Sequence, residues 1–213
     1  SLERLQTKFI DLYQIHRWDY ETPIEETLVA LDQLVKDNKV GHIGASSMYT
    51  WQFAKSLWTS NELDLQRFET MTNFYNLCYR EEEREMIPFC KDQNISVLPY
   101  SPVAKGFLTG KYTRNEKNDT IRFKTDPRLA ERFFKPEDFD VLEIVMQIAN
   151  EKGVKPAQIA LAWLLEKNTA PIIGVTKKSH VEDAVESLNI KLTSNDMKQL
   201  EEPYKIHPTT GYE

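Results

Sequence analysis

Hydrophobic residues along the chain follow two alternating periods, one typical of strands and the other of helices. Residues 9–15 (FIDLYQI) are mostly apolar and predict a buried strand. A helix is predicted next, and its apolar face would be formed by Ile24, Leu28, Leu31, Leu34 and Val35. We interpret residues 22–25 (TPIE) as a capping box that begins this helix, with Pro23 at the first helical position.

Later segments continue the alternation of strands and helices. Further strands are expected at residues 40–46, 67–76, 95–101 and 170–176. Further helices are expected at residues 50–58, 80–94, 136–152, 157–168, 180–189 and 194–204. A second capping box is predicted at residues 179–182. Residues 103–135 are polar and poorly periodic, which indicates a functional loop or disorder.

The strict alternation favours right-handed βαβ units and a parallel sheet. Polar residues at the expected strand ends are His16, Ser46, Asn73 and Ser101, spaced by 30, 27 and 28 residues. This spacing is close to the roughly 30 residues that each unit of a (β/α)8 barrel uses. Only five strands are recognised, so the sequence predicts part of a TIM-type barrel.

Composition narrows the class of protein. Hydrophobic residues make up 40% of the 213 residues and charged residues 28%, as is typical of a globular protein. Lys and Arg number 27 against 33 Asp and Glu, and this net charge of -6 without a basic block argues against a nucleic-acid partner. No apolar run reaches the roughly 18 residues of a membrane span, and the first residues do not resemble a signal peptide. We therefore expect no membrane partner and a cytoplasmic location.

Cysteines and histidines give no indication of a metal site. Cys78 and Cys90 have neither the spacing of a disulfide framework nor that of zinc ligands, which fits a reducing compartment. The four histidines form no HExxH pair, so no bound metal is expected. The acidic run at residues 79–86 (YREEEREM) could hold paired catalytic carboxylates, but its helical spacing favours the solvated face of a helix.

Active sites of such barrels lie at the carboxyl ends of the strands. Here these ends carry polar and aromatic side chains, at His16, Ser46–Ser47, Thr72–Asn73, Tyr100–Ser101 and residues 174–176. Taken alone, His16 fits two interpretations, a hydrogen-bonded core histidine or a catalytic one. Lys177 and Lys178 start a predicted helix whose free N–H groups could bind phosphate, although loop lysines are commonly only solvated.

Several longer motifs resemble the aldo-keto reductases, in particular the aryl-alcohol dehydrogenase-like members. They are SLERLQTKFIDLYQIHR, HIGASSM, NFYNLCYREEEREM, LPYSPVAKGFLTGKY and PIIGVTKKSHVEDAV, in this order along the whole chain. The resemblance implies a parallel (β/α)8 TIM barrel that binds NADP without a Rossmann fold. It also implies an oxidoreductase that reduces aldehydes or ketones to alcohols, so that a small carbonyl or alcohol substrate is the expected partner.

The resemblance also implies roles for individual residues. His16 matches the catalytic histidine that hydrogen-bonds the substrate carbonyl, and Trp18 is a candidate for lining the substrate pocket. Ser46 and Ser47 match the pair that holds the nicotinamide carboxamide, and Thr72 stands where the family usually has glutamine. The other implied cofactor contacts are Tyr100 at the nicotinamide ring, the pyrophosphate loop with Ser101, Val103 and Gly106, and the adenosine and 2′-phosphate segment with Gly174, Thr176, Lys178, His180 and Asp183.

The resemblance covers only part of the family's catalytic machinery. The family's catalytic Asp, Tyr and Lys lie on the first three βα units, whereas residues 1–213 match the fourth to eighth units as a single domain. We therefore expect this truncated chain to be inactive by itself. Two alternatives stay open, a non-catalytic NADP-binding sensor or regulatory subunit, similar to potassium-channel β-subunits, and a degenerate remnant. His16 favours the enzyme, while the carbonyl substrate and the oligomeric state do not follow from the sequence.

Overall fold

The computed structural model describes residues 1–114, 125–126 and 133–210. Contacts within the chain divide it into two compact units. Unit 1 contains Ser1–Asn73, Glu82–Leu98 and the described residues from position 208 onward. Unit 2 contains Phe74–Glu81 and the described part of Pro99–His207. The single partial-barrel domain expected over residues 1–213 stays a prediction.

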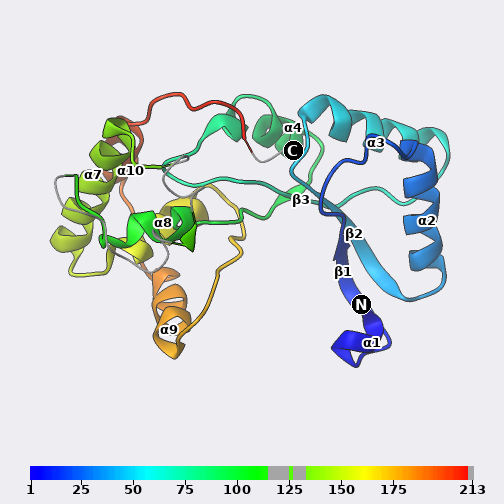
Figure 1. The fold of residues 1–213 in the computed structure, drawn as a ribbon, viewed down its shortest axis with the longest axis horizontal. Coiled ribbons are helices and arrows are strands. Elements are labelled where there is room, and N and C mark those ends of the chain that lie inside the picture. Colours follow the sequence, from blue (N-terminus) through cyan, green and yellow to red (C-terminus); the bar gives the residue numbers. More distant parts are fainter. Residues whose placement is uncertain (115–124, 127–132, 211–213) are drawn as a thin grey trace. The chain divides into compact units, whose positions relative to one another are not determined.

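Unit 1 is built on a parallel sheet with the strand order β1-β2-β3-β4, and Figure 1 labels the first three of these strands. The strands are β1 (Ile10–Gln14), β2 (Val40–Ser46), β3 (Thr70–Thr72) and β4 (Ser96–Val97). Neighbouring strands pair in parallel register, as in Gln14 with Gly44, Gly44 with Thr70 and Met71 with Val97. The predicted α/β fold with a parallel sheet is thus confirmed, with shorter strands than the sequence pattern suggested.

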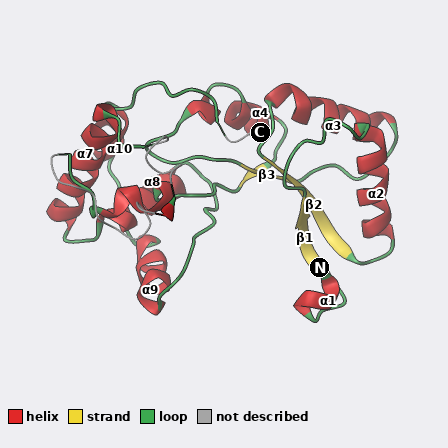
Figure 2. Cartoon of the chain, in the orientation of Figure 1, coloured by secondary structure: helices red, strands yellow, loops and turns green. Residues whose placement is uncertain are grey.

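Helices of unit 1 follow the strands and bury one face of the sheet (Figure 2). They are α2 (Ile24–Lys36), α3 (Thr50–Glu62) and α4 (Met86–Asp92), and the short α1 (Leu2–Leu5) precedes β1. The apolar face predicted for α2 lies in the core, because Ile24, Leu28 and Leu31 are buried and the next two apolar residues are partly buried against them. The helical periodicity therefore identified this face correctly.

The opposite face of the sheet carries small and polar side chains. In β2, Gly44 stands between the buried Ile43 and Ala45, and in β3, the buried Met71 stands between Thr70 and Thr72. Successive side chains of a strand point to opposite faces, so the residues between the core positions share the other face. This polar face includes Gln14, whose side-chain amide reaches the threonine hydroxyls of β3.

Replacing Gly44 tests how closely the side chains of Gln14 in β1 and Thr70 in β3 approach the backbone of β2. A Cβ at this position would clash with Thr70 Oγ1 and lie 3.0 Å from Cγ of Gln14. We expect Gly44→Ala to lower the free energy of unfolding by about 1–3 kcal/mol, the usual cost of an overpacked site. Urea melts followed by circular dichroism measure the change. Gly174→Ala is the control, since nothing lies within 4 Å of a Cβ built there, and equal losses in both variants would contradict the prediction.

Unit 2 is mainly helical. Its elements are η2 (Ala104–Thr109), α7 (Pro136–Lys152), α8 (Pro156–Glu166), α9 (Lys178–Ser187) and α10 (Ser194–Glu201). The apolar residues spaced along one face of α7 are all buried, namely Phe139, Leu142, Val145, Ile148 and Ala149. This helix ends at Gly153 in the left-handed conformation (φ 66°), as the sequence predicted.

The strand predicted at residues 170–176 is wrong, because only one of its residues pairs. Ile172 forms an isolated parallel bridge with Tyr100, and its N–H donates to the carbonyl of Pro99 at 2.7 Å. Tyr100 in turn bridges to Phe74. Pro171 has no N–H to donate, so it cannot extend the pairing on its side of the bridge. Three short segments, at Phe74, Tyr100 and Ile172, therefore meet in unit 2 through single bridges and not through continuous strands.

Both predicted capping boxes are also wrong. The hydroxyl of Thr22 donates to Asp19 Oδ2 at 2.7 Å, and Pro23 is the residue that caps α2. Helix α9 begins two residues earlier than the predicted start at residue 180, so Lys177 caps it and Ser179 lies inside it. A serine or threonine side chain can bond to other local acceptors, and at Thr22 the nearby carboxylate provides one.

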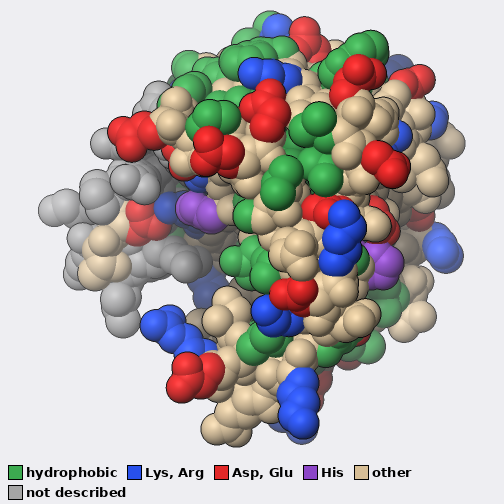
Figure 3. Space-filling model, turned by 90° about the vertical axis from the view of Figure 1, so that its right-hand side faces the viewer, with side chains coloured by type: hydrophobic (Ala, Val, Ile, Leu, Met, Phe, Trp, Pro, Cys, Tyr) green, Lys and Arg blue, Asp and Glu red, His purple; other side chains and the backbone are tan. Residues whose placement is uncertain are grey.

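The face of the molecule drawn in Figure 3 has no dominant charge. Acidic, basic and hydrophobic side chains are interspersed over the face drawn in Figure 3. Within the described residues, no helix is long and apolar enough to cross a membrane. The loop predicted at residues 103–135 begins with η2, and residues 115–124 and 127–132 of it lie outside the described residues.

Candidate functional site

Three of the predicted cofactor residues lie together at the carboxyl ends of β2 and β3. Ser46 Oγ donates to the carbonyl of Thr72 at 3.1 Å and lies 3.3 Å from Ser47 Oγ. The N–H of Ser47 donates to the same carbonyl at 3.0 Å. All three residues are buried, with at most 8% of their surface exposed. The structure therefore gathers three hydroxyl-bearing residues, which we call the hydroxyl cluster, around the backbone carbonyl of Thr72 in unit 1.

His16 lies two residues beyond the end of β1, the strand that pairs with β2. The hydrogen bonds between β1 and β2 continue up to Ile15, whose N–H donates to the carbonyl of Gly44 at 2.9 Å. His16 is exposed, and no described residue forms a hydrogen bond or an ion pair with its ring. The interpretation of His16 as a hydrogen-bonded core histidine is therefore wrong. Its catalytic role stays a prediction.

Trp18, the predicted substrate-lining residue, packs at the edge of the core of unit 1. It is partly buried, and its ring centroid lies 6.0 Å from that of Trp51 in α3. This contact holds the indole in place. A contact of Trp18 with substrate stays a prediction.

Left-handed backbone marks several predicted site residues. Ser47 in unit 1 has φ 43°, and Ser101 in unit 2 has φ 53°. This conformation costs a residue with a side chain roughly 1–2 kcal/mol, and such positions occur preferentially at functional sites. In unit 2, the N–H of Ala104 donates to Ser101 O at 2.9 Å, and that of Gly106 (φ 97°) donates to Val103 O at 2.9 Å. The residues predicted to contact pyrophosphate thus form one tight turn.

Tyr100, predicted to stack on the nicotinamide ring, lies beside an aromatic residue of unit 2, Phe74. Its ring centroid lies 5.3 Å from that of Phe74, with an angle of 32° between the planes. The backbones of the same two residues form a parallel bridge. Tyr100 remains partly exposed.

The predicted adenosine segment is mostly open to solvent. Gly174, Thr176 and Lys178 are exposed, while His180 and Asp183 are half-buried. The N–H of Thr176 donates to His180 Nδ1 at 3.4 Å, so these two residues are brought together. Other pairs involve residues outside the prediction, namely Lys178 Nζ with Glu182 Oε1 at 3.3 Å and Asp183 Oδ1 with Lys155 Nζ at 2.5 Å. The hydrogen bond with Asp183 raises the pKa of Lys155.

One acidic residue was assigned wrongly to a solvated helix face. Residues 80–94 form the 3₁₀ helix η1 (Glu81–Glu83) and α4 in place of one helix. Glu82 is only 1% exposed, and its Oε2 accepts a hydrogen bond from Asn73 Nδ2 at 2.9 Å. Asn73 Oδ1 is buried and has no hydrogen-bond partner among the described residues. In the sequence, the position of Asn73 at a predicted strand end was the only indication that it could belong to a site.

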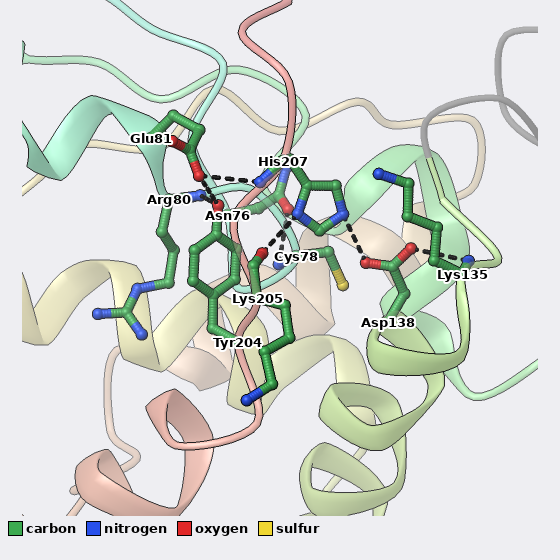
Figure 4. Close-up of polar contacts among 9 residues, drawn as sticks. All are labelled: Asn76, Cys78, Arg80, Glu81, Lys135, Asp138, Tyr204, Lys205 and His207. Atoms are coloured by element: carbon green, nitrogen blue, oxygen red, sulfur yellow. Dashed lines mark hydrogen bonds and ion pairs between the residues drawn. The ribbon is translucent and has the colours of Figure 1, made fainter.

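A buried polar network in unit 2 was not foreseen (Figure 4). His207 Nε2 lies 3.0 Å from Asp138 Oδ1, and His207 Nδ1 lies 2.8 Å from the carbonyl oxygen of Lys205. The carbonyl oxygen and an ionised carboxylate both accept, so a protonated imidazole, which donates from both ring nitrogens, satisfies both contacts. The hydrogen bond with Asp138 accordingly raises the pKa of His207, against the opposing effects of burial and of the positive charge of Lys135.

The same network joins the chain near its C-terminus to the segment before η1. The hydroxyl of Tyr204 donates to Glu81 Oε1 at 2.6 Å and accepts the N–H of Arg80 at 3.0 Å. Burial and the bond to Glu81 raise the pKa of Tyr204. The N–H of His207 donates to the same Glu81 oxygen at 3.0 Å. Within unit 2, these bonds attach the segment after α10 to Arg80 and Glu81.

Neither cysteine can act as a nucleophile in this structure. Cys78 and Cys90 are both free and buried. Burial raises the pKa of both thiols, to about 12 for Cys90. The reactive thiolate is therefore not populated near neutral pH. Among the described residues, no group of three or more His, Cys, Asp or Glu could hold a metal ion.

Comparison with known proteins points to one family. The family model described as the Aldo/keto reductase family matches residues 1–205. "Putative aryl-alcohol dehydrogenase C750.01" of Schizosaccharomyces pombe is 41% identical over 211 residues, which are 99% of this chain and 64% of that protein. The versiconal hemiacetal acetate reductase of Aspergillus parasiticus is 40% identical over 215 residues, which are 98% of this chain and 62% of that protein.

A solved structure agrees with these sequence matches. The crystal structure of the thermostable aldo-keto reductase Tm1743 with the inhibitor epalrestat has a TM-score of 0.76 and 25% identity, over 95% of this chain and 62% of that chain. The chain spans less than two thirds of the length of each of these three proteins. Because the family model covers almost the whole chain and the relatives align along its full length, this chain belongs to the aldo-keto reductase family.

Proposed function

We propose that this chain is the cofactor-binding part of an NADP-dependent oxidoreductase that reduces aldehydes or ketones to alcohols. One observation carries the proposal: the exposed His16 follows β1, and the hydroxyl cluster of Ser46, Ser47 and Thr72 lies at the ends of the next two strands. Family membership supports the reaction class. No described residue occupies the ring nitrogens of His16, so they are available to a substrate.

The hydroxyl cluster suits the carboxamide of a nicotinamide ring. A primary carboxamide offers one acceptor oxygen and two donor hydrogens, and hydroxyl groups can serve both. When bound, the nicotinamide supplies the hydride. The role proposed for His16 is to donate a hydrogen bond to the carbonyl oxygen of the substrate, and for Trp18 to bound its pocket.

Residues of unit 2 are proposed to bind the rest of NADP. Tyr100 would stack on the nicotinamide ring, and the turn that contains Ser101, Val103 and Gly106 would meet the pyrophosphate with its backbone N–H groups. The N-terminus of α9 favours an anion, and Lys178 in its first turn adds a positive charge. Gly174, Thr176, His180 and Asp183 complete the proposed adenosine segment.

Lys178 provides the test for a preference for NADP over NAD. Its side chain is 92% exposed, and among the described residues its ammonium group pairs with Glu182 on the same helix, whose side chain is 55% exposed, so a 2′-phosphate could replace this partner. We expect Lys178→Ala to weaken NADPH binding about tenfold, the loss of one charge-assisted hydrogen bond, without changing NADH binding. Isothermal titration calorimetry with both cofactors measures this. Lys198→Ala, which removes an exposed lysine of α10, is the control. Equal affinities for the two cofactors, unchanged in Lys178→Ala, would overturn the preference.

Turnover separates the enzyme from the sensor and the remnant. NADPH absorbance is followed with a reactive aldehyde, for the 213-residue chain and for the product of the complete reading frame. We expect the 213 residues to bind NADPH without turnover, since the resemblance assigns the family's general-acid tyrosine to a preceding segment. Turnover only by the longer product supports the enzyme. Binding without turnover in both supports the sensor, and no binding in either supports the remnant.

A further inference from the structure

Gln14 connects three strands on the polar face of the sheet in unit 1. It is the last residue of β1, and its Nε2 donates to the hydroxyl of Thr72 and, at 3.4 Å, to that of Thr70. Both threonines belong to β3, so the side chain of Gln14 crosses over β2 to reach them. The crossing point is Gly44, which pairs with Gln14 on one side and with Thr70 on the other.

Glycine at position 44 is what makes this crossing possible. A Cβ there would clash with Thr70 Oγ1 and lie 3.0 Å from Cγ and 3.4 Å from Nε2 of Gln14. Any side chain at position 44 would therefore occupy the path of the glutamine amide. The hydroxyls of Thr70 and Thr72 hold the amide in place. Gly44 leaves the room that the amide occupies over β2.

Two polar groups of Gln14 and Thr72 form no hydrogen bond with a described residue. Both N–H groups of the Gln14 amide are directed to threonine hydroxyls, so its Oε1 is left as an acceptor without a partner among the described residues. Thr72 Oγ1 accepts from Gln14 and donates to no described residue, so its own hydroxyl proton is also unused. The pair thus presents one acceptor and one donor on neighbouring residues. A primary carboxamide presents the complementary set, an N–H donor and a carbonyl acceptor.

We propose that Gln14 and Thr72 together bind the carboxamide of the nicotinamide ring, with Gln14 Oε1 accepting its N–H and the Thr72 hydroxyl donating to its oxygen. This proposal rests on the function proposed above. It explains how a chain with threonine where the family usually has glutamine retains a carboxamide contact: the glutamine comes from β1 across Gly44. Ser46, whose hydroxyl donates to the carbonyl of Thr72, fixes the backbone of the pair.

A cofactor analogue isolates the contact of Gln14. The 3-acetylpyridine analogue of NADPH keeps the carbonyl oxygen and lacks the amide N–H groups, so it cannot donate to Gln14. By calorimetry on the 213-residue chain, we expect the wild type to bind NADPH about fivefold more tightly than the analogue, the value of one neutral hydrogen bond. In Gln14→Met this preference disappears, because NADPH binding weakens to the level of the analogue. Gln33→Met, which changes an exposed glutamine of α2, keeps it.

Two further variants make the result independent of the first. Thr72→Val removes the donor to the carbonyl oxygen, which both ligands have, so both should bind about fivefold more weakly and the preference should persist. Adding Thr72→Gln to Gln14→Met should restore the preference for NADPH, by placing the amide at the position the family usually uses. Circular dichroism spectra identify folded variants, and Thr72→Val gives the decision should Gln14→Met not fold.

The possible results separate this proposal from the one it rests on. Failure of the wild-type chain to bind either ligand would overturn both proposals. A preference for NADPH that survives Gln14→Met would overturn the role of Gln14 and leave the cofactor assignment intact. Loss of preference in Thr72→Val would also contradict the division of roles between the two residues.

Discussion

His16→Ala is expected to lower kcat for carbonyl reduction about a hundredfold in catalytically active protein. The hydrogen bond that we propose from His16 strengthens as negative charge develops on the substrate oxygen, so its loss acts mainly on the transition state. The affinity for NADPH should hardly change, since the hydroxyl cluster that we assign to the cofactor does not include the histidine. Steady-state kinetics with a reactive aldehyde and calorimetric titration of NADPH measure the two effects separately.

A matched histidine serves as the control for this experiment. His42 is an exposed residue of the neighbouring strand β2, and its ring lies 2.7 Å from Glu69. His42→Ala should leave kcat unchanged, and His16→Gln, which keeps a hydrogen-bond donor, should lose less than His16→Ala. Turnover of His16→Ala near that of the wild type would contradict the catalytic role.

Asp138→Ala is expected to lower the free energy of unfolding by about 3–5 kcal/mol, because it leaves the buried imidazolium of His207 without its counter-ion. The side chains of Asp138 and His207 are 1% and 5% exposed, so water cannot replace the lost partner. The carboxylate also accepts the N–H of Lys135 at 3.0 Å at the start of α7, and this bond is lost as well. Urea melts near pH 6 measure the difference. Asp140→Ala is the control, since this carboxylate in the same turn is 53% exposed and bonds to Arg114.

The same pair should make stability depend on pH. The pKa of His207 is raised in the folded state, so its contribution is complete below the unfolded-state pKa of about 6.5. The contribution is lost as pH rises through the raised folded-state pKa. The urea midpoint of the wild type should therefore fall from pH 6 upward, and this fall should be absent in His207→Gln. Identical pH profiles in the two proteins would contradict the charged pair.

Elements that depend on local pattern were predicted well from the sequence. Strand β2 has the predicted bounds Val40–Ser46, and the buried face of α2 and the end of α7 at Gly153 agree with the helical period and with the left-handed preference of glycine. The gathering of Ser46, Ser47 and Thr72 could also be anticipated, because the carboxyl ends of parallel strands lie along one edge. These features need only the spacing of residues along the chain and the direction of the strands.

Features that depend on a specific distant partner could not be predicted in this way. Glu82 was expected in solvent but is buried against Asn73, and the predicted strand around Ile172 is reduced to one bridge beside Tyr100. His207 meets Asp138 across 69 positions of sequence. The period of a segment states which face is apolar, but it does not state which polar group of another segment will lie against it.

By itself, the sequence determined the parallel α/β architecture, the core face of α2, and the strand ends where polar residues collect. Only the tertiary structure decided how the polar residues are arranged: that His16 is exposed, that the amide of Gln14 passes over Gly44 to Thr72, and that His207 pairs with Asp138. The reason is physical. Burial of apolar surface is non-directional and follows from pattern alone, whereas a hydrogen bond needs a particular donor within about 3 Å of a particular acceptor, and only the folded chain sets that distance.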